Sequence, residues 1–311
     1  MDDCSTDGSL DIAGEMAASD MRFKVFSMPR NSGAGDARQA AIEKSSGEFI
    51  GFVDADDYVD MDFVAVLYGL ITKTGADVAC CQHYFYDEEH QRLTTPWAYD
   101  DKVVCLSPDE AMRKMKGYDQ MDEGLWNKLC RREIVVRHRM ETFPFEDAFV
   151  LYKYVPEAAS VALCCVPLYY YYQRDGSLMH TGYTPYKAFA RYKLEILKDK
   201  AIRGTDRLET GVALYYIRKG LKLLREFGLL ERSADVSEAC RGVLECLHGF
   251  DYVSDTELGV KGLIARHFVY KRLWKYLELN RKFVATFRKR KMEKVCHKYS
   301  LQTMEVFQKG L

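Results

Sequence analysis

Two hydrophobic periodicities alternate along the first 180 residues. Short apolar runs bounded by glycine, proline or acidic residues predict strands over 22–28, 48–53 and 161–172. Apolar residues spaced three and four apart predict a helix that follows Ser5 or Thr6 and ends near residue 19, and another over 36–45, where Asp36 is an N-cap candidate. Strands that alternate with helices in this way predict an open α/β sheet.

Beyond about residue 184 the pattern is that of amphipathic helices. The apolar spacing predicts helices over 186–201, 207–227, 234–248 and 260–279. We therefore expect an α/β domain over 1–184 and a helical extension over 185–311. A chain of 311 residues with 48% hydrophobic residues is long enough to bury a sizeable core in such an arrangement.

Three carboxylates at the end of the 48–53 strand carry the first chemical signal. Asp54, Asp56 and Asp57 follow the strand directly, and open α/β sheets bind ligands at the carboxyl ends of their strands. Neighbouring carboxylates repel one another, and Mg²⁺ or Mn²⁺ carrying phosphate oxygens compensates them well. An ordinary acidic surface turn is the alternative interpretation, because aspartate is common in turns.

Six signatures occur in a fixed order around this strand. A DDxSTDGS turn opens the chain, an N-x-G-x-x-x-AR helix start follows at Asn31, and the strand itself reads GEFIGFVDADD. A WNKL segment begins at Trp126, an ED pair at Glu146 and a YYY-x-R-x-x-S stretch at Tyr170. With these motifs at ordinary spacing, residues 1–180 resemble the family 2 glycosyltransferases.

The resemblance implies the GT-A fold, a Rossmann-like mixed α/β sheet with flanking helices. It also implies how a nucleotide-sugar donor is held: Asp3 contacts the uracil or ribose, Arg38 lies over the nucleotide, and Asp54 meets the ribose. Asp56 matches the ligand of Mn²⁺ or Mg²⁺ that bridges to the diphosphate, and Asp57 is expected to support it. The helix start departs from the family pattern, because Gln39 stands where asparagine is usual.

The ED pair matches the family's catalytic base. By the resemblance, Asp147 takes the proton from the acceptor hydroxyl, and the sugar is inverted at its anomeric carbon. The adjacent carboxylate of Glu146 can raise the pKa of this base toward working pH. Acidic residues also favour the first turn of a helix, and 148–154 is predicted to be helical, so the pair can serve both purposes.

Other residues are assigned to the sugar or diphosphate by the same resemblance. Trp126 and Asn127 could shape the acceptor or donor sugar pocket, because an aromatic face packs on a sugar ring and an amide bonds its hydroxyls. A core position for Trp126 is an equal alternative. The last group follows the tyrosine-rich strand and could close over the diphosphate, with a metal contact considered only for the histidine: Arg174, Ser177 and His180.

Composition restricts the cellular setting. Ten cysteines without a C-x-x-C pair, including the doublets at Cys80 and Cys164, indicate buried thiols in a reducing compartment and do not favour zinc. We read the four tyrosines of 169–172 mainly as core and cleft wall. No secretory signal opens the chain, and its longest apolar run is too short for a membrane helix, so a cytoplasmic protein is expected.

Charge is unevenly distributed despite a net value of −1. Residues 261–298 contain 13 lysines and arginines against two glutamates, with interleaved aromatic residues. Such helices can bind anionic lipid, which would place the enzyme peripherally on the inner face of the plasma membrane, near a lipid-linked acceptor. A solvated basic face is the alternative. The overall charge gives no nucleic-acid signal.

The start of the chain is unusual for the family. A family member normally has a strand, a helix and a strand ahead of the first acidic turn, whereas this sequence begins at that turn with Met1. We therefore expect a GT-A domain whose N-terminal strand–helix–strand segment is missing here. A start codon assigned too far downstream and a natural fragment are the two explanations.

These features predict an inverting, metal-dependent hexosyl- or N-acetylhexosaminyltransferase. It would move a sugar from a nucleoside diphosphate, expected to be UDP, to a cell-surface glycan or lipid-linked acceptor in polysaccharide or cell-envelope biosynthesis. The alternative from another class is a catalytically inactive, truncated glycosyltransferase-like binding module. A nucleotidyltransferase shares the fold type and metal use, but it gives the WNKL, ED and tyrosine-rich motifs no role.

Overall fold

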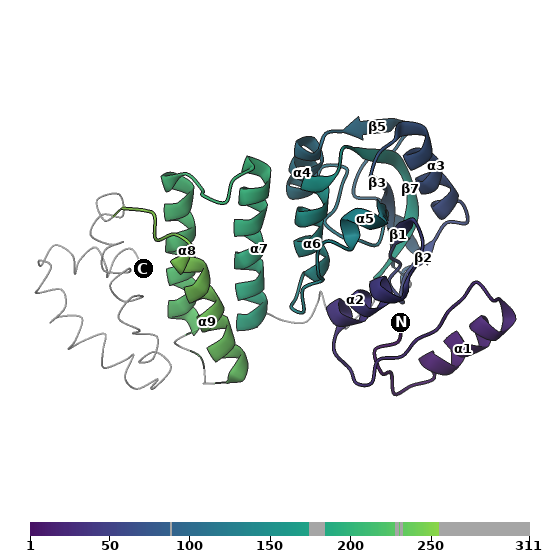
Figure 1. Ribbon diagram of the computed structural model, residues 1–311, viewed down its shortest axis with the longest axis horizontal. Coiled ribbons are helices and arrows are strands. Elements are labelled where there is room, and N and C mark those ends of the chain that lie inside the picture. Colours follow the sequence, from purple (N-terminus) through teal and green to yellow (C-terminus); the bar gives the residue numbers. More distant parts are fainter. Residues whose placement is uncertain (88, 174–183, 228–229, 231–232, 255–311) are drawn as a thin grey trace, which may run out of the picture. The chain divides into compact units, whose positions relative to one another are not determined.

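The computed structural model describes residues 1–311 except 88, 174–183, 228–229, 231–232 and 255–311. The chain divides into two compact units, Met1–Thr181 and Gly182–Leu311. The first unit contains the sheet, and the described part of the second is helical (Figure 1). The predicted helix over 260–279 and the basic stretch over 261–298 lie outside the described residues.

A seven-stranded mixed sheet organises the first unit. Its main path runs β1-β6-β3-β7-β2, while β4 pairs with β3 and β5 pairs with β7. The long central strands β3 and β7 are parallel to each other, and the other pairs are antiparallel. The strands are β1 Phe49–Gly51, β2 Tyr58–Val59, β3 Val78–Asp87, β4 Arg92–Thr94, β5 Val103–Leu106, β6 Lys128–Arg131 and β7 Val161–Gln173.

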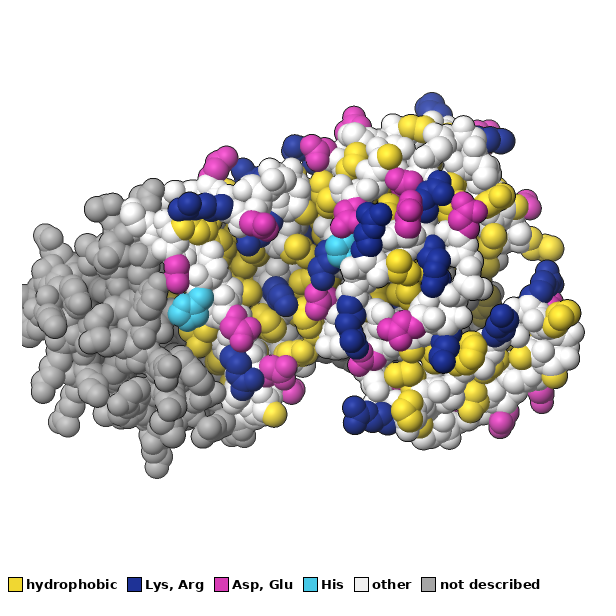
Figure 2. Space-filling model, in the orientation of Figure 1, with side chains coloured by type: hydrophobic (Ala, Val, Ile, Leu, Met, Phe, Trp, Pro, Cys, Tyr) yellow, Lys and Arg dark blue, Asp and Glu magenta, His cyan; other side chains and the backbone are white. Residues whose placement is uncertain are grey.

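The helices of this unit are α1 Ser9–Ser19, α2 Ala34–Lys44, α3 Phe63–Thr74, α4 Pro108–Gly117, α5 Arg132–Val135 and α6 Glu146–Tyr154, followed by the 3-10 turn η1 Val155–Glu157. Helix α3 buries Phe63, Leu67 and Ile71 in a core that includes residues of β3 and β7. By contrast, α1 buries none of its residues, and Ile12 is 63% exposed. Basic and acidic side chains are interspersed on the visible face of the first unit (Figure 2).

Several element predictions needed correction. Residues 22–28 form no strand: Ser27 makes an isolated parallel bridge with Asp2, and a strand requires a longer paired neighbour. Neither Ser5 nor Thr6 caps α1, which begins after Gly8 with the Asp7 carboxylate accepting the Ser9 N–H at 2.9 Å.

The next helix and strand also differ at their ends. Helix α2 begins at Ala34 instead of Asp36, because Gly33 adopts φ +88° at its N-cap and Asp36 then falls in the first turn. Strand β1 is shorter than the predicted 48–53, and among the described strands it pairs with β6 alone.

Three helices form the described part of the second unit: α7 Pro185–Arg203, α8 Thr210–Phe227 and α9 Ala234–His248. The bounds of α9 are those predicted, and α7 and α8 differ from prediction by up to three residues. Their shared core brings α7 and α9 so close that a Cβ at Gly242 would lie 2.2 Å from the Phe189 ring. Within the described residues, no helix has the length and hydropathy needed to cross a membrane.

The cysteine doublets are buried, as predicted. Cys80, Cys81, Cys164 and Cys165 are free thiols inside the sheet region, and burial raises the pKa of each. A thiol with a raised pKa is a poor nucleophile at neutral pH, so these residues act as small apolar side chains of the core.

Candidate active site

The glycine-bearing loop before α2 is held by Asp3. Its Oδ1 accepts the Ser32 N–H at 2.8 Å, and its Oδ2 accepts the Gly33 N–H at 2.7 Å. Both carboxylate oxygens therefore satisfy backbone donors at the beginning of the helix, where an anion is favoured by the helix dipole. In this structure Asp3 shapes the loop that leads to Arg38.

Close packing fixes α2 against the segment that precedes α6. A Cβ at Gly35 would lie 1.9 Å from the Glu141 carbonyl oxygen, so this position requires glycine. Four residues along the helix, Gln39 accepts the Met140 N–H through its Oε1 at 3.0 Å. The residue that departs from the family pattern thus makes a specific contact that fixes the helix.

This packing brings Arg38 to the carboxylates. Its guanidinium donates to Asp54 Oδ1 at 2.6 Å and to Glu146 Oε1 through its other terminal nitrogen. The side chains are part-buried, with exposed fractions of 20% for Arg38, 27% for Asp54 and 18% for Glu146. One arginine of α2 therefore links the loop after β1 with the first turn of α6.

The ED pair begins α6 directly after a strained residue. Phe145 has φ +70°, a left-handed conformation that is rare for a bulky side chain and commonly found at functional sites. Asp147 accepts the Ala148 N–H at 2.8 Å. Burial raises the pKa of Asp147 to about 7, the Glu146 carboxylate adds to the rise, and Arg38 opposes it. A carboxyl group with this pKa can exchange a proton near neutral pH.

Asp54, Asp56 and Asp57 form a short loop between β1 and β2. The Asp57 N–H donates to the Asp54 carbonyl at 3.1 Å, and Asp56 between them is exposed. The Asp57 carboxylate accepts the Tyr169 hydroxyl at 2.6 Å and the Tyr172 N–H at 2.9 Å. Burial raises the pKa of Asp57 to about 7 against the effect of the Tyr169 bond, and Asp54 and Asp56 add to the rise.

The acidic loop fits one mode of divalent-metal binding. Among the described residues, no group of three or more His, Cys, Asp and Glu side chains forms a ready metal cage. Magnesium and manganese do not need one, because they commonly take one or two protein carboxylates and complete their shell with phosphate and water. The excess negative charge that raises the pKa of Asp57 is also what a cation at Asp56 would relieve.

Strand β7 lines the site with two tyrosines on one face. Trp126 is 9% exposed, and its ring centroid lies 4.5 Å from that of Tyr169 and 5.6 Å from that of Tyr171. Burial raises the pKa of Tyr171, and carboxylates from both the acidic loop and the ED pair raise it further. The sequence analysis read the four tyrosines of 169–172 mainly as core and cleft wall, and the two-residue spacing of Tyr169 and Tyr171 places both on one face of the strand.

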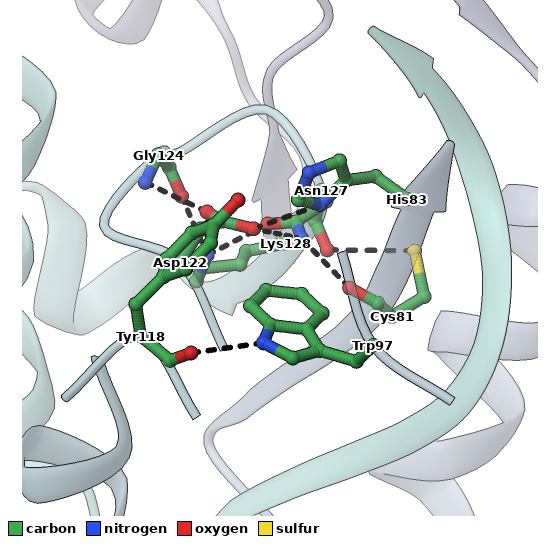
Figure 3. A network of polar contacts seen from close by, with 8 residues as sticks. All are labelled: Cys81, His83, Trp97, Tyr118, Asp122, Gly124, Asn127 and Lys128. Atoms are coloured by element: carbon green, nitrogen blue, oxygen red, sulfur yellow. Dashed lines mark hydrogen bonds and ion pairs between the residues drawn. The ribbon is translucent and has the colours of Figure 1, made fainter. Parts of the chain in front are cut away.

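Asn127 and Lys128 of the WNKL segment belong to a network of polar contacts (Figure 3). Asn127 is 1% exposed; its amide nitrogen donates to the Cys81 carbonyl and to Asp122 Oδ2, each at 2.7 Å, and its oxygen accepts from Lys128. The structure therefore places Asn127 in a buried polar network, and Trp126 takes the core position that was the alternative to a sugar pocket.

Lys128 is the centre of this network. Its ammonium donates to Asp122 Oδ1 at 3.0 Å and to the Gly124 carbonyl and Asn127 Oδ1, each at 2.6 Å, so its three N–H groups are matched by three acceptors. Burial favours a raised pKa for Asp122, but Lys128 and His83 outweigh it and lower the pKa below its ordinary value. Sequence reasoning did not predict this ion pair, because Asp122 belongs to none of the motifs.

Comparison with known proteins agrees with this geometry. Residues 1–138 match the family model described as glycosyl transferase family 2. Over these residues the chain is similar to the family 2 glycosyltransferases. Among its relatives is the glycosyltransferase GlyG of Streptococcus pneumoniae, 25% identical over 77% of this chain and 82% of GlyG. The cholesterol galactosyltransferase of Borreliella burgdorferi is 29% identical over 57% of this chain, which spans about half of that enzyme.

A solved structure supports the fold prediction. The TarS fragment 1–349 of Staphylococcus aureus, crystallised with UDP-GlcNAc, aligns with a TM-score of 0.56 over 89% of this chain and 80% of its own, at 19% identity. The predicted GT-A α/β fold is therefore confirmed.

The structure brings most of the predicted site residues together. Arg38, Asp54, Glu146 and Asp147 form one electrostatic cluster next to the loop that carries Asp56. Asp3 supports the cluster through the α2 loop. Trp126 and Asn127 are buried, and three predicted residues lie outside the described part of the chain: Arg174, Ser177 and His180.

Proposed function

We propose that this chain is an inverting, metal-dependent glycosyltransferase that uses a UDP-sugar. The observation that carries the proposal is the bridge made by Arg38, which places the acidic loop of Asp54 beside the ED pair. A donor site and a base with a pKa near 7 are thereby held within one electrostatic cluster. The choice of UDP is supported by the TarS structure solved with UDP-GlcNAc.

In this mechanism Asp147 is the general base. It takes the proton of an acceptor hydroxyl while the hydroxyl oxygen forms a bond with the anomeric carbon of the sugar. The bond between that carbon and the diphosphate oxygen breaks, and its electron pair leaves with the nucleoside diphosphate. Attack from the face opposite the leaving group inverts the anomeric configuration.

Arg38 and the acidic loop would handle the donor. Asp56 would hold Mn²⁺ or Mg²⁺, and the bound ion would supply charge neutralisation for the departing diphosphate. Arg38 pairs with both Asp54 and Glu146 and thereby holds the acidic loop beside the ED pair. Trp126 and the β7 tyrosines form an apolar wall beside them, suited to exclude water from the site.

The acceptor we propose is a cell-surface glycan or a lipid-linked precursor. TarS, a poly(ribitol-phosphate) β-N-acetylglucosaminyltransferase of S. aureus, is 37% identical over 25% of this chain, which supports a polymeric envelope acceptor. Residues 261–298 supply the basic and aromatic composition for peripheral contact with an anionic membrane. An inactive binding module is less favoured, because the predicted base and acidic loop are assembled together.

Ligand-dependent stability tests the donor site. We expect UDP with Mn²⁺ to raise the unfolding midpoint, since a ligand that binds only the native state stabilises it, by about 2.7 kcal/mol at 100 times its Kd. The rise should disappear with EDTA and in Asp56→Asn, and it should persist in Asp101→Asn, a matched change at an exposed carboxylate of the loop before β5. An unchanged midpoint in the wild-type chain would support the binding-module alternative.

Product analysis tests the mechanism. Once a UDP-sugar that supports turnover is found, the anomeric configuration of the product is read by NMR coupling constants. We expect it to be opposite to that of the donor. Retention would overturn the single-displacement role of Asp147.

A further inference from the structure

Strand β7 makes three hydrogen bonds to the acidic loop. The Tyr169 hydroxyl accepts the Asp54 N–H at 3.1 Å and donates to Asp57 Oδ2 at 2.6 Å. The Tyr172 N–H donates to Asp57 Oδ1 at 2.9 Å. Since the Asp57 N–H also closes the loop onto the Asp54 carbonyl, one phenol joins both ends of a four-residue turn. Asp56 lies between these anchored ends.

The phenol is itself firmly placed. Tyr169 has no exposed surface, and its ring packs against Phe63 and Trp126 at centroid distances of 6.0 and 4.5 Å. Directly after the loop, β2 pairs with β7, with Val59 opposite Tyr169. A rotation of this ring would displace core side chains, so its hydroxyl is a fixed point for the loop.

The Tyr169 ring contacts Trp126, the first residue of the WNKL segment. A Cβ at Gly124 would lie 2.2 Å from the indole nitrogen of Trp126, and the Gly124 carbonyl accepts from Lys128. The polar network therefore fixes the turn that carries Trp126, and Trp126 supports Tyr169. This series of contacts connects the buried network around Lys128 to the exposed carboxylates.

We propose that Tyr169 is a positioning residue for donor binding: its hydroxyl holds Asp54 and Asp57 so that the Asp56 carboxylate is presented in a fixed direction. The inference rests on the proposed function, since it assigns Asp56 to the donor's metal ion. In this arrangement Asp57 supports the loop through β7, because both of its oxygens accept hydrogen bonds from that strand.

The decisive variant is Tyr169→Phe, which keeps the ring and removes the hydroxyl. A hydrogen bond to a charged group is among the stronger ones, so we expect UDP·Mn²⁺ affinity to fall roughly 10- to 100-fold in titration calorimetry. Tyr154→Phe is the matched control. That tyrosine is equally buried, and its hydroxyl contacts Met140 Sδ at 3.9 Å, outside the site. Its loss should leave the affinity unchanged.

Substitutions at Asp57 separate support from metal binding. Asp57→Asn retains an oxygen that can accept from β7 and should keep affinity within about tenfold of wild type, whereas Asp57→Ala should resemble Tyr169→Phe. The double variant Tyr169→Phe with Asp57→Ala should lose less affinity than the sum of the two single losses, because both changes remove the hydrogen bond between Tyr169 and Asp57. Loss of binding in Asp57→Asn as complete as in Asp56→Asn would overturn the proposal, since Asp57 would then bind the ion itself.

Hydrogen exchange without ligand tests the positioning role of Tyr169 separately from the proposed function. We expect the peptide covering 52–58 to exchange faster in Tyr169→Phe than in wild type or Tyr154→Phe, because the Asp54 N–H loses its acceptor. Unchanged exchange would overturn the positioning role whatever the nucleotide result. Faster exchange in a chain whose wild type binds no nucleotide would support the role of Tyr169 and contradict the proposed function.

Discussion

Two clusters of cations and carboxylates in the same unit are built in opposite ways. In the buried network, Lys128 is 1% exposed and gives each of its three N–H groups to an acceptor. In the candidate active site, Arg38 is 20% exposed and divides one positive charge between Asp54 and Glu146, with Asp147 close by. The pKa of Asp122 falls in the first cluster, whereas that of Asp147 rises to about 7 in the second.

The difference shows how one fold separates stability from chemistry. A buried carboxylate whose charge is fully matched stays ionised and serves as a structural anchor. A buried carboxylate among other carboxylates retains a tendency to bind a proton or a cation, which is what a base or a metal site requires. The surplus of acid around Arg38 is the feature on which the proposed function rests, whereas the charges around Lys128 are balanced.

The largest effect is expected for Asp147→Asn. Removing the base should lower turnover about 10²- to 10⁴-fold, because general base catalysis typically contributes that much, while UDP binding is retained. Steady-state kinetics and the UDP-dependent unfolding midpoint measure the two quantities. Turnover within threefold of wild type would exclude Asp147 as the base.

Lys128→Met breaks the buried ion pair and should lower the free energy of unfolding by an amount comparable to the rise in activation free energy expected for Asp147→Asn. The Asp122 charge would be left without its partner, which typically costs about 3–5 kcal/mol in the free energy of unfolding. Urea unfolding monitored by tryptophan fluorescence measures it, because Trp97 and Trp126 lie in this unit.

Two further variants test that explanation. Lys102→Met breaks an exposed lysine–aspartate pair and should leave stability nearly unchanged. Adding Asp122→Asn to Lys128→Met should recover part of the loss, since the buried charge is then gone. Equal losses from Lys128→Met and Lys102→Met would mean that the network does not stabilise the fold.

A smaller effect should follow from Gly35→Ala. The new methyl group would meet the Glu141 carbonyl, so α2 must shift, at a cost of about 1–3 kcal/mol in stability and with displacement of Arg38 from its partners. Gly69→Ala in α3 is the control, because nothing lies within 4 Å of its Cβ and the change should be neutral or stabilising. Thermal unfolding and turnover of both variants provide the comparison.

The smallest effect is a change in pH dependence for Glu146→Gln. The base must be ionised to act, so kcat/KM should rise as pH increases through the Asp147 pKa, about 7 in the wild-type chain. Removing a neighbouring negative charge favours ionisation, so the pKa falls and the rise moves to lower pH, by about one pH unit or less. A pH–rate profile at saturating metal tests this, and a move to higher pH would contradict the arrangement.

Local pattern was sufficient where a segment forms its structure with its own residues. The bounds of α9 followed from apolar spacing, and the ED pair was placed at a helix start, where α6 begins. Prediction failed for the strand over 22–28, because strand formation depends on a partner that the segment itself does not contain. Prediction also failed for the network around Asp122 and Lys128. Lys128 belongs to the WNKL motif and Asp122 to no motif, so only their burial in the folded chain shows that they interact.

The sequence by itself determined the family resemblance, the α/β fold and the carboxylates that we propose as the site, because these depend on short motifs and periodicity. Only the tertiary structure determined which carboxylates share the positive charge of Arg38. Arg38, Asp54 and Glu146 are far apart along the chain, and their pairing depends on the tight approach of α2 at Gly35. The tertiary structure likewise determined that the Tyr169 hydroxyl bonds the acidic loop, because β7 and this loop are distant in sequence and close in space.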